Sequence, residues 1–147
     1  MEEKVLKVFT DGGSRGNPGP AAAGVYITLG EQEVFKGGKY LGETTNNIAE
    51  YKALVLAVNW VLSNFSKHSV KEVLFTMDSE LIVKQIKGEY KVKDEKLKEH
   101  YIFVNEKLSQ LKLSGVNYQF RHVKRHENKV ADKVVNQILD KSSRGQI

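Results

Sequence analysis

The chain has 147 residues, 40% of them hydrophobic and 28% charged, with a net charge of +5. This is enough for one domain with its own core, and the lack of cysteine excludes disulfide bonds and thiolate-bound zinc. No apolar run could span a membrane and no signal peptide is evident, so we expect a cytoplasmic protein without membrane contact. The excess of Lys and Arg suits a polyanionic partner.

Three strands are predicted in the first third of the sequence. Apolar and polar residues alternate in three segments, which indicates strands over residues 4–10, 22–29 and 33–41. Between the first two, the Gly-, Asn- and Pro-rich stretch 12–20 predicts a loop. The connection 30–32 is short enough to make the second and third strands an antiparallel hairpin.

Helices and strands alternate in the remainder of the sequence. Apolar residues recur at three- and four-residue spacing in four segments, which predicts helices over residues 47–65, 79–87, 94–112 and 128–141. Two further strands are predicted over residues 70–77 and 116–123. The order β-β-β-α-β-α-α-β-α favours an α/β fold whose mixed sheet has an antiparallel meander, then parallel strands, and helices on both faces.

Four acidic residues stand where a strand is expected to end or a helix to begin: Asp11, Glu50, Asp78 and Asp132. If the first and fourth strands are adjacent and parallel, Asp11 and Asp78 face each other at one edge of the sheet. Gly12 and Gly13 remove side chains beside Asp11, which would let another backbone approach closely. Because hard cations such as Mg²⁺ take oxygen ligands, the set predicts a divalent-metal site.

Taken singly, each acid also has a structural explanation. Asn47 and Glu50 have the spacing of a capping box. Ser79 is suited to cap the helix that follows the fourth strand. Asn128 is suited to cap the last helix, where Asp132 would be favourable to the helix dipole. The case for a metal site therefore rests on the four acids as a set.

The chain resembles the type 1 ribonuclease H family from Val5 to about Leu139. Four segments are similar to the four motifs of that family, in order: TDGGSRGNPG (10–19), TTNNIAEY (44–51), TMDSE (76–80) and HENKVAD (126–132). The resemblance implies a ribonuclease H-like fold, with a five-stranded mixed sheet between helices. It implies a single catalytic domain over residues 1–141, and we expect residues 142–147 to be a flexible C-terminal tail.

The resemblance also implies an activity. The expected enzyme is an endoribonuclease that cleaves the RNA strand of RNA/DNA hybrids, nearly independently of sequence, to 5′-phosphate and 3′-hydroxyl products. Two Mg²⁺ ions, with Mn²⁺ as a substitute, would activate a water and stabilise the leaving 3′ oxygen. The implied metal ligands are Asp11, Glu50, Asp78 and Asp132, with Asp11 expected to bridge the two ions.

Substrate contacts follow from the same resemblance. The RNA strand would meet the backbone of one loop and a few polar side chains, namely Gly12, Gly13, Ser14, Asn17, Asn47 and Glu50. Thr45 and Asn46 would lie toward the DNA strand. Many family members carry a histidine that is thought to help the product leave. Here His126 takes that role, or Arg125 does, or neither.

Three features depart from the family pattern. Glu80 stands where glutamine is frequent, and Glu43 where relatives that grip a DNA phosphate often have arginine. Residues 88–101 also lack the Trp- and Lys-rich protrusion of some bacterial members. We therefore expect weak and strongly salt-dependent binding of the hybrid.

Two alternatives to this function remain open. One is a structure-selective DNA nuclease of the same superfamily. The other is a catalytically silent hybrid-binding module, which would be expected to lack one of the four acids. Double-stranded RNA and RNA–DNA junctions stay open as further substrates, and we expect a monomer.

Overall fold

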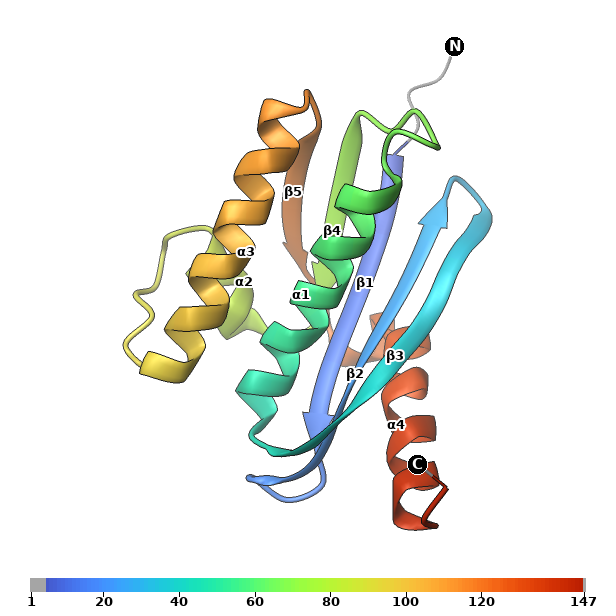
Figure 1. The fold of residues 1–147 in the computed structure, drawn as a ribbon, viewed down its shortest axis with the longest axis vertical. Coiled ribbons are helices and arrows are strands. Elements are labelled where there is room, and N and C mark those ends of the chain that lie inside the picture. Colours follow the sequence, from blue (N-terminus) through green and yellow to red (C-terminus); the bar gives the residue numbers. More distant parts are fainter. Residues whose placement is uncertain (1–4, 147) are drawn as a thin grey trace.

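A five-stranded sheet forms the centre of the computed structural model, which describes residues 5–146 (Figure 1). The strands lie in the order β3-β2-β1-β4-β5. Their bounds are β1 (Val5–Ser14), β2 (Gly19–Leu29), β3 (Gln32–Thr44), β4 (Glu72–Met77) and β5 (Asn117–His122). The β1–β2 and β2–β3 pairs are antiparallel, whereas β1–β4 and β4–β5 are parallel. The predicted mixed sheet is confirmed.

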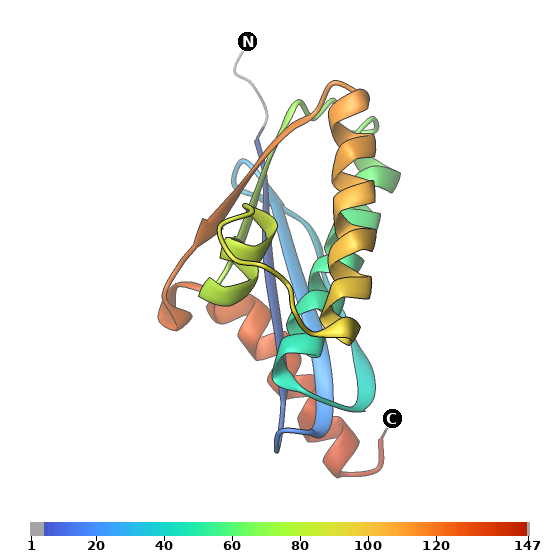
Figure 2. The same ribbon diagram turned by 90° about the vertical axis from the view of Figure 1, so that its left-hand side faces the viewer.

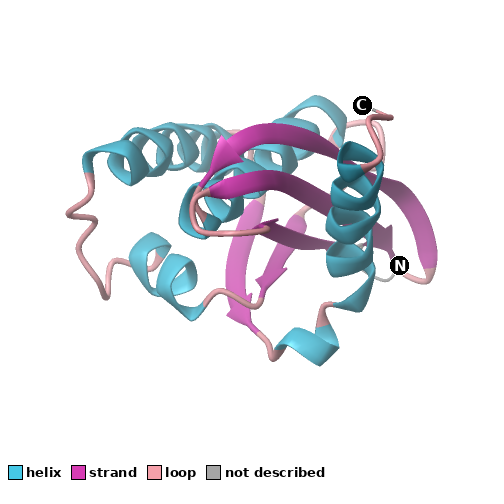
Figure 3. Cartoon of the chain, turned by 90° about the horizontal axis from the view of Figure 1, so that it is seen from below, coloured by secondary structure: helices cyan, strands magenta, loops and turns pink. Residues whose placement is uncertain are grey.

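Helices cover both faces of this sheet. They are α1 (Asn46–Asn64), α2 (Glu80–Ile86), α3 (Glu95–Leu113) and α4 (Lys129–Ser143), with a short 3₁₀ turn, η1 (Arg125–Glu127), before α4. Helices α1 and α3 lie on one face, and α4 crosses the other over β1, β2 and β3 (Figure 2, Figure 3). No helix within residues 5–146 has the length and apolarity needed to cross a membrane.

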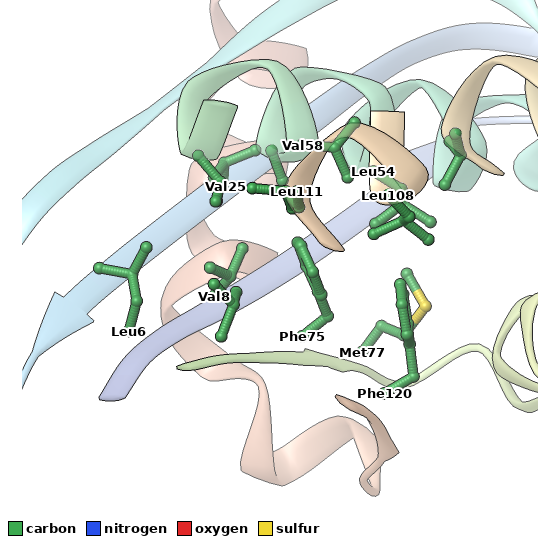
Figure 4. Close-up of a cluster of buried hydrophobic side chains, with 14 of the residues drawn as sticks. Leu6, Val8, Val25, Leu54, Val58, Phe75, Met77, Leu108, Leu111 and Phe120 are labelled. Atoms are coloured by element: carbon green, nitrogen blue, oxygen red, sulfur yellow. The ribbon is translucent and has the colours of Figure 1, made fainter. Parts of the chain in front are cut away.

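The main core lies between the sheet and helices α1 and α3 (Figure 4). Alternate residues of β1 and β4 point into it, because successive side chains of a strand point to opposite faces. They meet the apolar faces of the two helices, and the contributors include Leu6, Val8, Leu54, Val58, Phe75, Met77, Leu108 and Leu111. A smaller cluster under α4 joins Ala22, Val135 and Leu139. The two clusters fix α1 and α4 on opposite sides of β1.

The first hairpin is longer than predicted. Its ladder runs to the pair Ser14–Ala21, so only Arg15–Pro18 lie outside the two strands. The expected loop over residues 12–20 is therefore mostly wrong. Glycine and alanine occur in these strand ends because helices pack close to them. From the sequence alone, the same small residues predict a loop. The last helix also ends at Ser143, two residues later than predicted.

Candidate active site

Asp11, Glu50 and Asp78 come together where β4 ends and the pairing of β1 with β4 stops, while β1 itself continues to Ser14. One carboxylate oxygen of each lies within 4.8 Å of those of the other two, an arrangement that could hold a metal ion. In the parallel pair, Thr10 lies beside Met77, so the next residue of each strand is its acid. The predicted proximity of Asp11 and Asp78 is thereby confirmed.

Asp132 reaches the same place from the first turn of α4. It lines, with the other three acids, a cavity of about 550 Å³. Helix α4 comes close because Gly24, the ladder partner of Asp11, has no side chain. A Cβ on Gly24 would lie 2.6 Å from the carbonyl oxygen of Ala131. This role of Gly24 was not predicted, since its only sequence signal is a lone glycine inside a strand.

Gly12 brings α1 equally close to β1. A Cβ on Gly12 would overlap the backbone of Ala49 and Glu50, whereas one on Gly13 would meet nothing nearer than 3.8 Å. The expected close approach of another backbone is confirmed at Gly12 but not at Gly13. It places Glu50 beside Asp11, where Glu50 is 8% exposed and its Oε2 has no hydrogen-bond partner among the described residues.

Helix α1 begins earlier than predicted. Its N-cap is Thr45, whose hydroxyl accepts a hydrogen bond from the backbone N–H of Ile48 at 3.3 Å. The predicted capping box of Asn47 and Glu50 is wrong, because Asn47 already lies inside the helix. The side chain of Glu50 is therefore free to line the cavity. By contrast, Ser79 caps α2 as predicted.

The acids strongly influence one another. Burial, together with the charges of Asp78 and Asp132, raises the pKa of Asp11 from its usual 3.8 to about 8, against an opposing effect of Arg125. Burial, then the charges of Asp11 and Asp78, raises the pKa of Glu50. Burial also raises the pKa of Asp78, again opposed by Arg125. The negative charges of these acids are therefore only partly balanced by nearby positive charge, which comes mainly from Arg125.

We predict that the metal-free protein loses stability as pH rises from about 4 to about 8. Between the pKa of Asp11 in the unfolded chain and its value of about 8 in the folded one, the folded state binds more protons, so a rise in pH favours unfolding. The expected loss between pH 5 and pH 8 is on the order of 4 kcal/mol, at about 1.4 kcal/mol for each pKa unit. Urea unfolding in EDTA at pH 5 and pH 8 measures it, and a higher free energy of unfolding at pH 8 would contradict it.

The predicted substrate-contact residues line two adjoining hollows. The acid cavity is lined by Gly12, Gly13, Ser14, Asn46 and Asn47. A second groove of about 820 Å³ is lined by Asn17 and Thr45, again with Asn46 and Asn47. The two asparagines of α1 therefore face both hollows. Of the residues predicted to contact the RNA strand, Asn17 lines only the second groove, Asn47 lines both hollows, and the others line only the acid cavity.

Asn46 joins the β1–β2 loop to the start of α1. Its Oδ1 accepts hydrogen bonds from the backbone N–H of Ser14 at 2.9 Å and from the Ser14 hydroxyl at 3.1 Å. Its own backbone N–H donates to Oδ1 of Asn17 at 3.0 Å. These bonds fix the spacing between the two hollows.

Arg125 and His126 lie in different places although they are adjacent in η1. Arg125 lines the acid cavity, with its Nη2 3.5 Å from Oδ1 of Asp132. His126 lines a separate small hollow with Phe9 and Tyr26. The structure thus brings Arg125, and not His126, to the acids.

Comparison with known proteins agrees with this geometry. A family model described as "Reverse transcriptase-like" matches residues 9–138. The Bifunctional protein Rv2228c of Mycobacterium tuberculosis is 36% identical over 135 residues, which are 90% of this chain and 35% of that protein. Ribonuclease HI of Halobacterium salinarum is 34% identical over 136 residues, 92% of this chain and 64% of that protein. The chain thus spans less than two thirds of the length of either relative.

Solved structures share the fold across almost the whole chain. LC11-RNase H1, isolated from compost and crystallised in complex with an RNA/DNA hybrid, has a TM-score of 0.81 and 43% identity, with 93% of this chain and 98% of that one covered. RNase H1 from Halobacterium salinarum has a TM-score of 0.80 and 33% identity over the same shares. By its sheet order, its matched model and these relatives, the chain belongs to the type 1 ribonuclease H family.

Proposed function

We propose that this protein is a metal-dependent endoribonuclease that hydrolyses the RNA strand of RNA/DNA hybrids to 5′-phosphate and 3′-hydroxyl products. The observation that carries the proposal is the convergence of Asp11, Glu50 and Asp78 within 4.8 Å, with Asp132 on the same cavity. The similarity to LC11-RNase H1, which binds such a hybrid, supports the choice of substrate. The described residues supply all four acids, in keeping with action as a monomer.

The donor set fits hard divalent cations. All four side chains offer carboxylate oxygens, and Oε2 of Glu50 is buried without a hydrogen-bond partner among the described residues. We propose two Mg²⁺ ions, replaceable by Mn²⁺, held by the four acids. When bound, they would supply Lewis acidity toward the attacking water and the departing 3′ oxygen. Asp11 is proposed as the shared ligand, since its charge acts directly on Glu50 and its own pKa responds to Asp78 and Asp132.

The residues around the acids would orient the substrate. The backbone of Gly12 and Gly13 lines the cavity without side chains, which leaves room for a ribose. Ser14 and Asn47 offer polar groups there, and a 2′-hydroxyl is both a donor and an acceptor. Arg125 adds a cation at the same cavity, with a side chain 79% exposed and so accessible to a phosphate.

The second groove is proposed to receive the DNA strand. It adjoins the cavity through Asn46 and Asn47, so two strands of one duplex would pass on either side of these asparagines. Its rim is acidic, because Glu43, Asp94 and Glu95 outnumber the one lysine, Lys96. Phosphates would be repelled there. We propose that affinity for the hybrid is therefore weak and depends mainly on contacts to the RNA strand.

We predict that the protein with Mg²⁺ cuts the RNA strand of an end-labelled RNA/DNA hybrid. EDTA and the substitution Asp78→Asn should each abolish the cutting, because both remove the metal from the reaction. Matched RNA/RNA and DNA/DNA duplexes define the substrate range. Lack of cutting of the hybrid in both Mg²⁺ and Mn²⁺ would refute the proposal. Cutting of DNA alone would indicate a DNA nuclease. Binding of the hybrid without any cutting would indicate a catalytically silent binding module.

A further inference from the structure

Residues 123–128 connect β5 to α4 and bond to β4 and β1 at the residues just before Asp78 and Asp11, and we call them the strap. Figure 2 shows the chain passing from β5 through η1, which lies in the strap, into α4. At one end, the backbone N–H of Val123 donates to the carbonyl of Met77 at 2.9 Å. At the other end, Nδ2 of Asn128 donates to the carbonyl of Thr10 at 2.8 Å. Each accepting residue directly precedes an acid.

The side chain of Asn128 attaches the second end of the strap to β1. It is 1% exposed, and although Asn128 occupies the N-cap position of α4, its side chain makes no capping hydrogen bond. Asn128 thus stands at the predicted cap position of α4, but without a side-chain capping hydrogen bond. Its Oδ1 has no hydrogen-bond partner within residues 5–146, so the side chain is held through the single bond to Thr10.

The backbone of Asn128 also starts the turn that carries Asp132. The carbonyl of Asn128 accepts the hydrogen bond from the N–H of Asp132 at 3.2 Å, and its own N–H donates to the carbonyl of Arg125 at 3.0 Å. One residue thus bonds to Thr10 of β1 through its side chain, and to Arg125 and Asp132 through its backbone. It lies between Asp11 on the strand and Asp132 on the helix.

We propose that Asn128 is a positioning residue that sets the placement of Asp132, and of Arg125, relative to Asp11. Mg²⁺ requires nearly ideal octahedral geometry, so a small shift of one carboxylate weakens binding. Groups that hold metal ligands in place typically contribute about 10- to 100-fold to metal affinity. This inference rests on the proposed function, because it assigns Asn128 to the same metal site.

The test is metal binding by Asn128→Ser, measured by calorimetric titration of the folded protein as the Mg²⁺ or Mn²⁺ concentration that half-saturates the site. Serine is a good N-cap, so the start of α4 is preserved while the amide that reaches Thr10 is lost. We expect this concentration to rise about 10-fold or more. Hybrid cleavage by the variant should need correspondingly more Mg²⁺ and should recover most of its rate at saturating metal.

Two control variants separate positioning from a general loss of structure. Thr76→Val alters another buried polar side chain on β4, whose hydroxyl has no hydrogen-bond partner within the described residues. Val104→Ala truncates a buried side chain of α3, in the main core. Both should keep the half-saturating metal concentration of the wild type, even where the melting temperature in EDTA is lower.

A half-saturating metal concentration for Asn128→Ser within about twofold of the wild-type value would overturn the inference. Such a change would be far smaller than the effect of a group that orients a metal ligand. A shift no larger than that of Val104→Ala would also overturn it. If Asn128→Ser does not fold, Asn128→Ala is measured at lower temperature against the same controls. Wild-type protein that binds metal but leaves the hybrid uncut would refute the proposed function, while the half-saturating metal concentrations would still decide the role of Asn128.

Discussion

Asp11→Asn should abolish hybrid cleavage and, at the same time, stabilise the metal-free protein. Loss of the proposed shared metal ligand would remove several kcal/mol of charge stabilisation, which corresponds to a rate at least about 10³-fold lower. The same change removes a buried carboxylate whose pKa is raised to about 8. At pH 8 the metal-free variant should therefore exceed the wild type by several kcal/mol in free energy of unfolding, at about 1.4 kcal/mol for each pKa unit.

Single-turnover cleavage and urea unfolding in EDTA measure the two halves of this result. Glu72→Gln is a suitable control, since it also converts a carboxylate to an amide on the same sheet but at the opposite end of β4. It should leave both quantities unchanged. The proposed role of Asp11 as a metal ligand would be contradicted if Asp11→Asn is less stable than the wild type in EDTA at pH 8. It would also be contradicted if the variant cleaves the hybrid within tenfold of the wild-type rate.

Gly12→Ala should destabilise the protein by about 3 kcal/mol or more. Inserting atoms into a packed interior typically costs about 1–3 kcal/mol, and here the new methyl group would overlap backbone atoms of Ala49 and Glu50, which cannot rotate away. Helix α1 would have to move from β1 and take Glu50 with it. We therefore expect metal binding to weaken as well. Urea unfolding with and without Mg²⁺ measures both effects.

Gly13→Ala is the matched control for this experiment. The added Cβ would lie 3.8 Å from Cγ1 of Val135 and 4.0 Å from Oδ1 of Asn46, which are ordinary contact distances. We expect its free energy of unfolding to stay within about 1 kcal/mol of the wild type, the scale of glycine-to-alanine effects in regular structure. Equal destabilisation by both substitutions would show that the close contact at Gly12 is not the cause.

Local periodicity was sufficient to predict the elements of the sheet and helices in their order. It also led to the pairing of Asp11 with Asp78, because the two strands are parallel neighbours, although β1 continues past Asp11 to Ser14. It did not fix where α1 begins. Thr44, Thr45, Asn46 and Asn47 are consecutive residues that are all suited to cap a helix, so the sequence cannot choose among them.

The remaining errors come from contacts between residues far apart in the chain. Gly12 reads as part of a turn, yet it lies in β1 because α1 contacts its backbone. Asn128 stands at the N-cap position, as predicted, but its amide bonds to the carbonyl of Thr10, which no local pattern specifies. The roles predicted for the four acids, for the substrate-contact residues and for His126 stay predictions, although the structure shows where each residue lies.

The passage of α4 across the sheet has a consequence for protein synthesis. Asp11 lies on the first strand and Asp132 on the last helix, so a growing chain has no complete site until α4 has left the ribosome and docked. The central strand β1 must likewise wait for β4, made after α1, before its parallel edge is paired. Incomplete translation products that lack α4 would thus lack Asp132, and the proposed nuclease activity would begin only with a nearly complete domain.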